Sequence, residues 1–114
     1  MRVYVIAMGL IVGLSAAHNT ASAASVEHGK TAFIQNGCWQ CHGTMGQGSI
    51  MTSAGKRLAP DPLPWETFLA FVRSSNRAMP SFSEKILSDD DLADIYAYLQ
   101  SVPEPPASIP LLNP

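Results

Sequence analysis

Hydrophobic residues recur at helical spacing in three parts of the chain. The clearest is SDDDLADIYAYLQSV, residues 88–102, in which Ser88 and Asp91 have the spacing of an N-terminal capping box. The acidic residues after the serine suit the positive end of a helix dipole. The sequence therefore predicts a helix that buries one face, formed by Leu92, Ile95, Tyr96 and Leu99.

Two further helices are predicted nearer the N-terminus. The first is VEHGKTAFIQN, residues 26–36, and Gly37 suits its end. Gly29 lies inside this helix at a cost of about 1 kcal/mol relative to alanine, so we expect a packing reason for it. The second is WETFLAFVR, which Pro64 opens. The predicted buried faces are Val26, Lys30, Phe33 and Ile34 in the first helix, and Trp65, Phe68, Leu69 and Val72 in the second.

The remaining segments are typical of irregular structure. Residues 43–64 contain four glycines and three prolines, which predicts an irregular loop that can wrap around another group. The tail, residues 103–114, has five prolines in 12 residues and is expected to be extended. No repeat and no strand pattern is evident, so the predicted fold class is all-α.

The first residues have the features of an export signal. Arg2 precedes an uncharged apolar run of 15 residues, 3–17, and small residues lead up to Ala23. A membrane-spanning helix needs ~20 apolar residues, so a cleaved signal is favoured over a retained anchor. We predict an export signal at residues 1–23, a domain at 24–102 and a proline-rich tail at 103–114. The signal is expected to be cleaved near Ala23, which predicts a periplasmic location. Contact with the membrane is expected only if the signal is retained.

The charge and the size of the chain limit the classes of function that it can have. Without Arg2 the chain has six basic and nine acidic residues, a formal charge of −3, which argues against nucleic-acid binding. A domain of this size builds only a modest core from protein alone. A buried apolar cofactor would supply part of the missing contact.

The only two cysteines, Cys38 and Cys41, precede His42 in the pattern Cys-x-x-Cys-His. This is the attachment pattern of a c-type haem. Two thiols one helical turn apart can reach two vinyl groups along one porphyrin edge, and the histidine can offer a nitrogen to iron. The sequence thus predicts one covalently bound haem c, held by Cys38 and Cys41, with His42 as an axial ligand.

Other uses of the motif each lack a component. Structural zinc needs four ligands, usually in two separated pairs, and one pair is present. A thioredoxin-like dithiol expects a βαβ context. A simple disulfide turn gives His42 no role.

The second axial position of the haem iron has four candidates, namely Met45, Met51, Met79 and His28. Met79 is favoured because it lies between the second and third predicted helices and is followed by the stiffening Pro80.

With these residues, the chain resembles the class I cytochromes c over about Val26 to Val102. The matching features are Gly29 and Phe33 in the first helix, Tyr98 in the last, the attachment motif, and Met79-Pro80. The resemblance implies three to four helices wrapped around one covalent haem, with the first and last helices crossing at Gly29. Residues 79–106 also resemble the small cytochromes that accompany periplasmic dehydrogenases.

The expected function is electron transfer and not enzymatic catalysis. We expect partners in a periplasmic dehydrogenase and a downstream electron acceptor; the alternative is a free soluble carrier to a terminal oxidase. An open-haem sensor or enzyme would follow if Met79 does not bind iron, and a colourless disulfide or metal domain if no haem is present. The residues predicted to line the haem pocket are Arg57, Leu58, Pro60, Trp65, Phe68 and Phe82.

Overall fold

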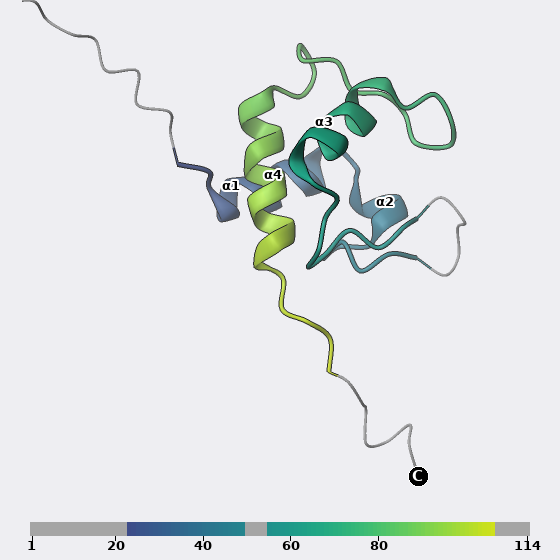
Figure 1. Cartoon of the computed structure of the whole chain (residues 1–114). Helices are drawn as coiled ribbons and strands as arrows, with labels where there is room; N and C mark the ends of the chain where they lie inside the picture. Colours follow the sequence, from purple (N-terminus) through teal and green to yellow (C-terminus); the bar gives the residue numbers. More distant parts are fainter. Residues whose placement is uncertain (1–22, 50–54, 107–114) are drawn as a thin grey trace, which may run out of the picture.

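The computed structural model describes residues 23–49 and 55–106, and in this part of the chain the only regular secondary structure is helical (Figure 1). The all-α prediction is confirmed. The helices are α1 (Val26–Gln35), α2 (Trp39–His42), α3 (Trp65–Ser74) and α4 (Asp89–Ser101). No helix within the described ranges is long and apolar enough to cross a bilayer. The predicted export segment, apart from Ala23, lies outside those ranges.

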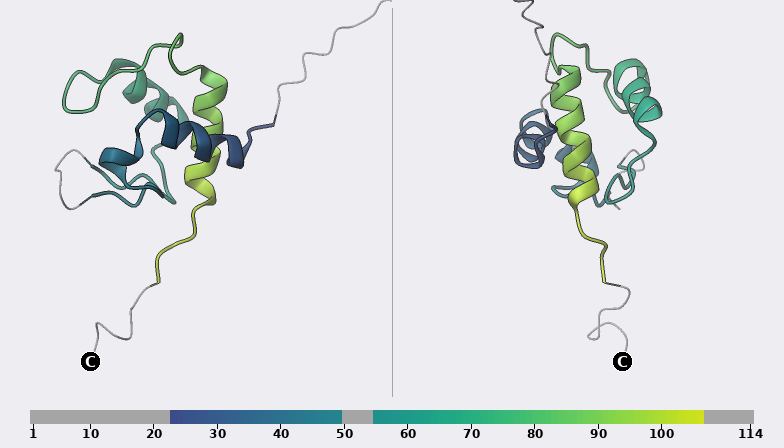
Figure 2. Two further views of the ribbon diagram at one scale, coloured as in Figure 1. Left: turned by 180° about the vertical axis from the view of Figure 1, so that it is seen from behind. Right: turned by 60° about the vertical axis from the view of Figure 1, so that its left-hand side comes forward.

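The contact between α1 and α4 brings the two ends of the domain together (Figures 1 and 2). Gly29 makes this possible, because a Cβ at this position would lie 1.9 Å from the backbone oxygen of Asp94 and 2.8 Å from the nitrogen of Ile95. The packing reason expected for Gly29 is therefore found. The rings of Phe33 and Tyr98 add to the same contact, with centroids 5.8 Å apart.

The predicted buried face of α1 is wrong at three of its four positions. Val26 and Ile34 are 44% and 38% exposed, and Lys30 is also exposed. Of that face only Phe33 is buried, and its buried companions on α1 are Gly29 and Ala32. Small residues form this side because the backbones of α1 and α4 approach so closely that larger side chains would not fit.

The prediction for α4 is confirmed at its start and adjusted along its face. Ser88 and Asp91 form the capping box, since the Ser88 hydroxyl accepts from the Asp91 N–H at 3.1 Å and the Asp91 carboxylate accepts from the Ser88 N–H at 3.3 Å. Tyr98 is buried together with Leu92, Ile95 and Leu99, whereas Tyr96 is half-buried. Burial raises the pKa of the Tyr98 phenol, which donates to the Thr44 carbonyl at 2.9 Å.

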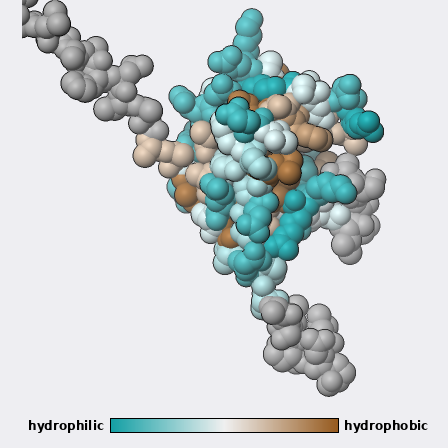
Figure 3. Space-filling view, in the orientation of Figure 1, coloured by the Kyte–Doolittle hydropathy of each residue, from teal (hydrophilic) through white to brown (hydrophobic). Residues whose placement is uncertain are grey.

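The third helix closes the other side of the core. Phe68 and Val72 are buried, and Trp65 and Leu69 pack against them, as the periodicity predicts. The described parts of the 43–64 loop are irregular, as expected. The Gly46 carbonyl holds this loop by accepting from the N–H groups of Leu58 and Ala59 at 2.7 and 3.0 Å. The outer side of α4 is largely polar, with scattered apolar residues (Figure 3).

Replacing Gly29 with alanine should destabilise the protein in spite of alanine's higher helix propensity. The added methyl group meets backbone of α4, which cannot rotate away, so we expect a loss of about 2 kcal/mol. The thermal midpoint should fall by roughly 10 °C. Circular dichroism melts of Gly29→Ala and of the exposed control Lys30→Ala test this; equal midpoints for the two variants would contradict the close crossing.

Asp94 should link stability to pH through its contacts with α1. Its carboxylate accepts from the Ser25 N–H and contacts His28 Nδ1, both at 2.6 Å, and these interactions lower its pKa below the ordinary value of 3.8. A carboxylate whose pKa is lowered in the folded state stabilises the fold at pH values above its ordinary pKa. This contribution is lost as the pH falls through the pKa of the folded state.

Asp94→Asn should therefore cost about 1 kcal/mol near pH 7, and the gap from wild type should close as the solution is acidified below pH 4. Urea unfolding at a series of pH values measures this gap. Asp90→Asn, which changes an exposed carboxylate of the same helix, is the control. A gap that stays constant from pH 7 to pH 3 would show that the charge of Asp94 does not contribute.

Candidate functional site

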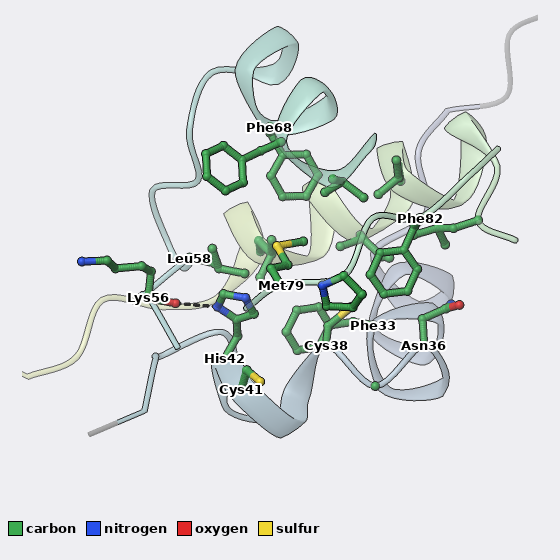
Figure 4. A pocket seen from close by; sticks show the side chains of 18 of the residues that line it. Phe33, Asn36, Cys38, Cys41, His42, Lys56, Leu58, Phe68, Met79 and Phe82 are labelled. Carbon is green, nitrogen blue, oxygen red and sulfur yellow. Dashed lines mark hydrogen bonds between the residues drawn. The ribbon is translucent and has the colours of Figure 1, made fainter. Parts of the chain in front are cut away.

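A cavity of about 400 Å³ lies between α2, α3, α4 and the segment that joins α3 to α4 (Figure 4). Its volume is in the range of small-molecule and cofactor sites. Its walls are mostly apolar and include Phe33 from α1, Phe68 and Val72 from α3, and Leu92, Ile95 and Leu99 from α4. Cys38, Cys41, His42 and Met79 all line this same cavity.

The cysteine–histidine segment is placed by the end of α1. Gly37 adopts a φ of 75°, in the left-handed region, and so turns the chain out of the helix. The Cys38 N–H then donates to the Phe33 carbonyl at 3.2 Å. The short helix α2 follows, and Gly43, with a φ of 77°, ends it directly after His42. The segment thus forms one wall of the cavity.

The imidazole of His42 is fixed by a backbone carbonyl. His42 is 8% exposed, and its Nδ1 lies 2.7 Å from the oxygen of Lys56 (Figure 4). Since a carbonyl can only accept, Nδ1 must carry the hydrogen. In the neutral form of the imidazole, which is the form that binds a metal, Nε2 then holds the free lone pair.

The two thiols are free and half-buried. Burial raises the pKa of the Cys38 thiol to about 11, so Cys38 is protonated at neutral pH. A redox-active dithiol instead needs a lowered thiol pKa. In the described ranges there is also no group of three or more His, Cys, Asp or Glu side chains that could hold a metal ion. The redox-dithiol and zinc alternatives therefore lose support.

Met79 reaches the cavity from the segment between α3 and α4, residues 75–88, here called the arm. Its side chain is half-buried, packs against the core and lines the cavity beside Pro80 and Phe82. The other candidate ligands lie elsewhere. Met45 is 46% exposed and does not line the cavity, and the His28 ring is on the surface with Asp94. Met51 falls outside the described residues.

The six predicted pocket residues divide into two groups. Leu58, Phe68 and Phe82 line the cavity, whereas Arg57, Pro60 and Trp65 do not. The Arg57 guanidinium donates to the Ala59 carbonyl at 2.7 Å and to Glu104 at 3.1 Å. The Trp65 ring packs against the rings of Phe68 and Tyr96.

Other lining residues were not predicted as part of a pocket. Phe33, Leu92, Ile95 and Leu99 were assigned to the core, and their periodicity gives no sign that they face a cavity. The Lys56 carbonyl could not be found either, because its role depends on a backbone atom in a loop. Phe71 and Leu63 also line the cavity, while remaining 56% and 50% exposed.

The residues present fit a haem. The cavity offers apolar walls for a porphyrin, two thiols on one wall, an imidazole with a free Nε2, and a thioether from the arm. Histidine with methionine is one of the axial ligand sets of haem proteins.

Comparisons with known proteins agree with this fit. Residues 24–99 match the family profile described as "Cytochrome C oxidase, cbb3-type, subunit III". The chain is 34% identical over 91 residues to cytochrome c6 of Synechocystis sp., covering 76% of this chain and 73% of that protein. No solved structure is significantly similar.

Two corynebacterial relatives are much longer proteins. The chain is 32% identical over 84 residues to the cytochrome bc1 complex cytochrome c subunit of Corynebacterium diphtheriae, and 30% identical over 82 residues to that of Corynebacterium efficiens. The matches cover 74% and 72% of this chain but span only 30% and 27% of those two proteins. Together with the family match and the cytochrome c6 similarity, they show that this chain belongs to the cytochrome c family.

Proposed function

We propose that the cavity holds one haem, bound covalently through Cys38 and Cys41, with His42 and Met79 as the two axial ligands, and that the protein passes single electrons. The observation that carries this proposal is the convergence of these four side chains on one apolar cavity from two separate segments. Four such groups have no common role in a simple apolar core.

Each residue has a distinct task. The Cys38 and Cys41 thiols would each add across one of the two vinyl groups and so hold the haem through thioethers. The Lys56 carbonyl holds the His42 ring in one tautomer and orientation, so that Nε2 points to the iron. Haem supplies an iron that changes its charge by one electron. The apolar walls exclude water from it.

The ligand pair favours electron transfer over substrate chemistry. A methionine thioether raises the reduction potential relative to harder ligands. When both axial positions are occupied by protein, no position remains for a substrate. Electrons then pass through the haem edge to a partner, and such encounters are usually small and short-lived.

The proposed setting is the periplasm, after removal of residues 1–23, with residues 24–102 as the haem domain and 103–114 as a tail. The apolar run before Ala23 supports export, and the resemblance of residues 79–106 to dehydrogenase-associated cytochromes supports a dehydrogenase as electron donor. A downstream acceptor completes the path. The alternative is a free carrier to a terminal oxidase.

Optical spectra of the purified exported protein test the haem proposal. We expect sharp c-type bands in the reduced protein that do not change with carbon monoxide. Met79→Ala should open the iron and give a shifted spectrum with the gas, whereas Met45→Ala should behave as wild type, because Met45 lies away from the cavity. A wild-type spectrum that shifts with carbon monoxide would point to a sensor or enzyme, and a colourless protein would contradict the haem proposal.

Covalent attachment is checked separately. Denatured wild-type protein should retain its haem on a gel, and the double variant Cys38→Ser, Cys41→Ser should lose it. Haem that separates from the denatured wild type would contradict the two thioethers.

The partner is tested with protein from its native host. If this protein is a dehydrogenase subunit, it should elute together with dehydrogenase activity in size-exclusion chromatography. Its haem should also be reduced when the substrate of the dehydrogenase is added. Elution at the size of the single chain, with no reduction by that substrate, would instead support the free carrier. The mature mass identifies the cleavage site.

A further inference from the structure

The arm that carries Met79 is tied to the end of α3 by polar contacts at several points. The Arg73 guanidinium donates through Nη1 to the Phe82 carbonyl at 2.9 Å and through Nη2 to the Asp89 carboxylate. The Phe82 N–H donates to the Val72 carbonyl at 2.9 Å. Nearer the ligand, the Ser75 hydroxyl donates to the Met79 carbonyl at 2.9 Å.

Arg73 differs from the other residues in these contacts because its side chain binds two separate parts of the chain at once. Phe82 lies in the middle of the arm, and Asp89 is the first residue of α4 beyond its end. A guanidinium presents its donors in a rigid planar fork, so one side chain can satisfy both acceptors with little extra ordering cost. The Arg73 side chain is also only 21% exposed, which reduces screening by water.

Apart from the hydrogen bonds described above, the arm is held by a few apolar side chains. Most of its residues are exposed, and its apolar contacts with the core come mainly from Met79, Phe82 and Leu87. A segment with few buried contacts opens locally at low cost. Loss of the Arg73 contacts should therefore free the arm well before the whole domain unfolds.

We propose that Arg73 is a positioning residue for the iron site, which holds the arm closed, keeps Met79 at the cavity and so excludes small external ligands such as carbon monoxide. This inference rests on the proposed role of Met79 as an axial ligand. Arg73 does not line the cavity and acts only through the arm.

The test measures how fast carbon monoxide binds to the reduced full-length holoprotein over times much longer than those of the optical spectra, in which the wild type stays unchanged. At high gas concentration the rate should become independent of concentration, because opening of the arm limits it. We expect Arg73→Gln to raise this limiting rate at least ~10-fold, as two hydrogen bonds to a charged group are lost. Arg73→Lys keeps the charge but loses the fork and should fall between Arg73→Gln and wild type.

Two matched controls separate the contact from general effects of charge. Lys85→Gln removes an exposed positive charge from the same arm and should leave the rate unchanged. Asp89→Asn removes the negative charge from the acceptor at the start of α4, which weakens its bond with Arg73, and should raise the rate. Asp90→Asn, at the neighbouring exposed carboxylate, should not. The Asp89 and Asp90 pair also keeps the test valid if the Arg73 variants fold poorly.

Urea unfolding of every variant distinguishes positioning from a merely structural role. If Arg73→Gln and Asp89→Asn lower the unfolding midpoint but bind carbon monoxide no faster than their controls, the proposal is wrong. Met79→Ala identifies which proposal has failed. Fast binding in Met79→Ala with unchanged rates in the Arg73 and Asp89 variants overturns only the role of Arg73. Slow binding in Met79→Ala would overturn Met79 ligation itself.

Discussion

The close contact of α1 and α4 at Gly29 is the constraint on which the rest of the site depends. Through Gly37, the end of α1 sets where the cysteine–histidine segment begins. Through its buried face, α4 supplies the back wall of the cavity. A change in the distance between these helices would therefore move the thiols relative to the wall they face. The geometry of the site is thus determined by a contact at Gly29, a residue that does not itself line the cavity.

The elements with strong local patterns were predicted correctly from the sequence. Features that depend on how closely two helices approach each other were missed. The capping box of α4 and the apolar face of α3 are local patterns, and both were predicted well. The face of α1 was predicted wrongly, because a hydrophobic pattern gives too little weight to small residues such as Gly29 and Ala32. Helix α2, with only four residues, is too short to show a period.

The residues of the site likewise divide into those that a local pattern predicts and those that depend on tertiary packing. The spacing of Cys38, Cys41 and His42 is visible in the sequence because neighbouring residues must act on one group. Met79 was chosen by its order along the chain, and the structure places it in the same cavity. By contrast, the assignment of Trp65 to the pocket used only its apolar character, which cannot distinguish a cavity wall from an aromatic cluster with Tyr96. Tertiary packing decides that difference.

The bonds that Asp94 makes with Ser25 and His28 join residues 69 and 66 positions apart. Most of the domain must therefore be enclosed as a loop before α1 and α4 meet, and the entropy of closing that loop opposes the contact. Proteins dominated by such distant contacts fold more slowly than helical proteins with local ones. A chain growing from its N-terminus also cannot complete this core until α4 has been made. The core of this small helical domain is thus complete only when α1 and α4 have met.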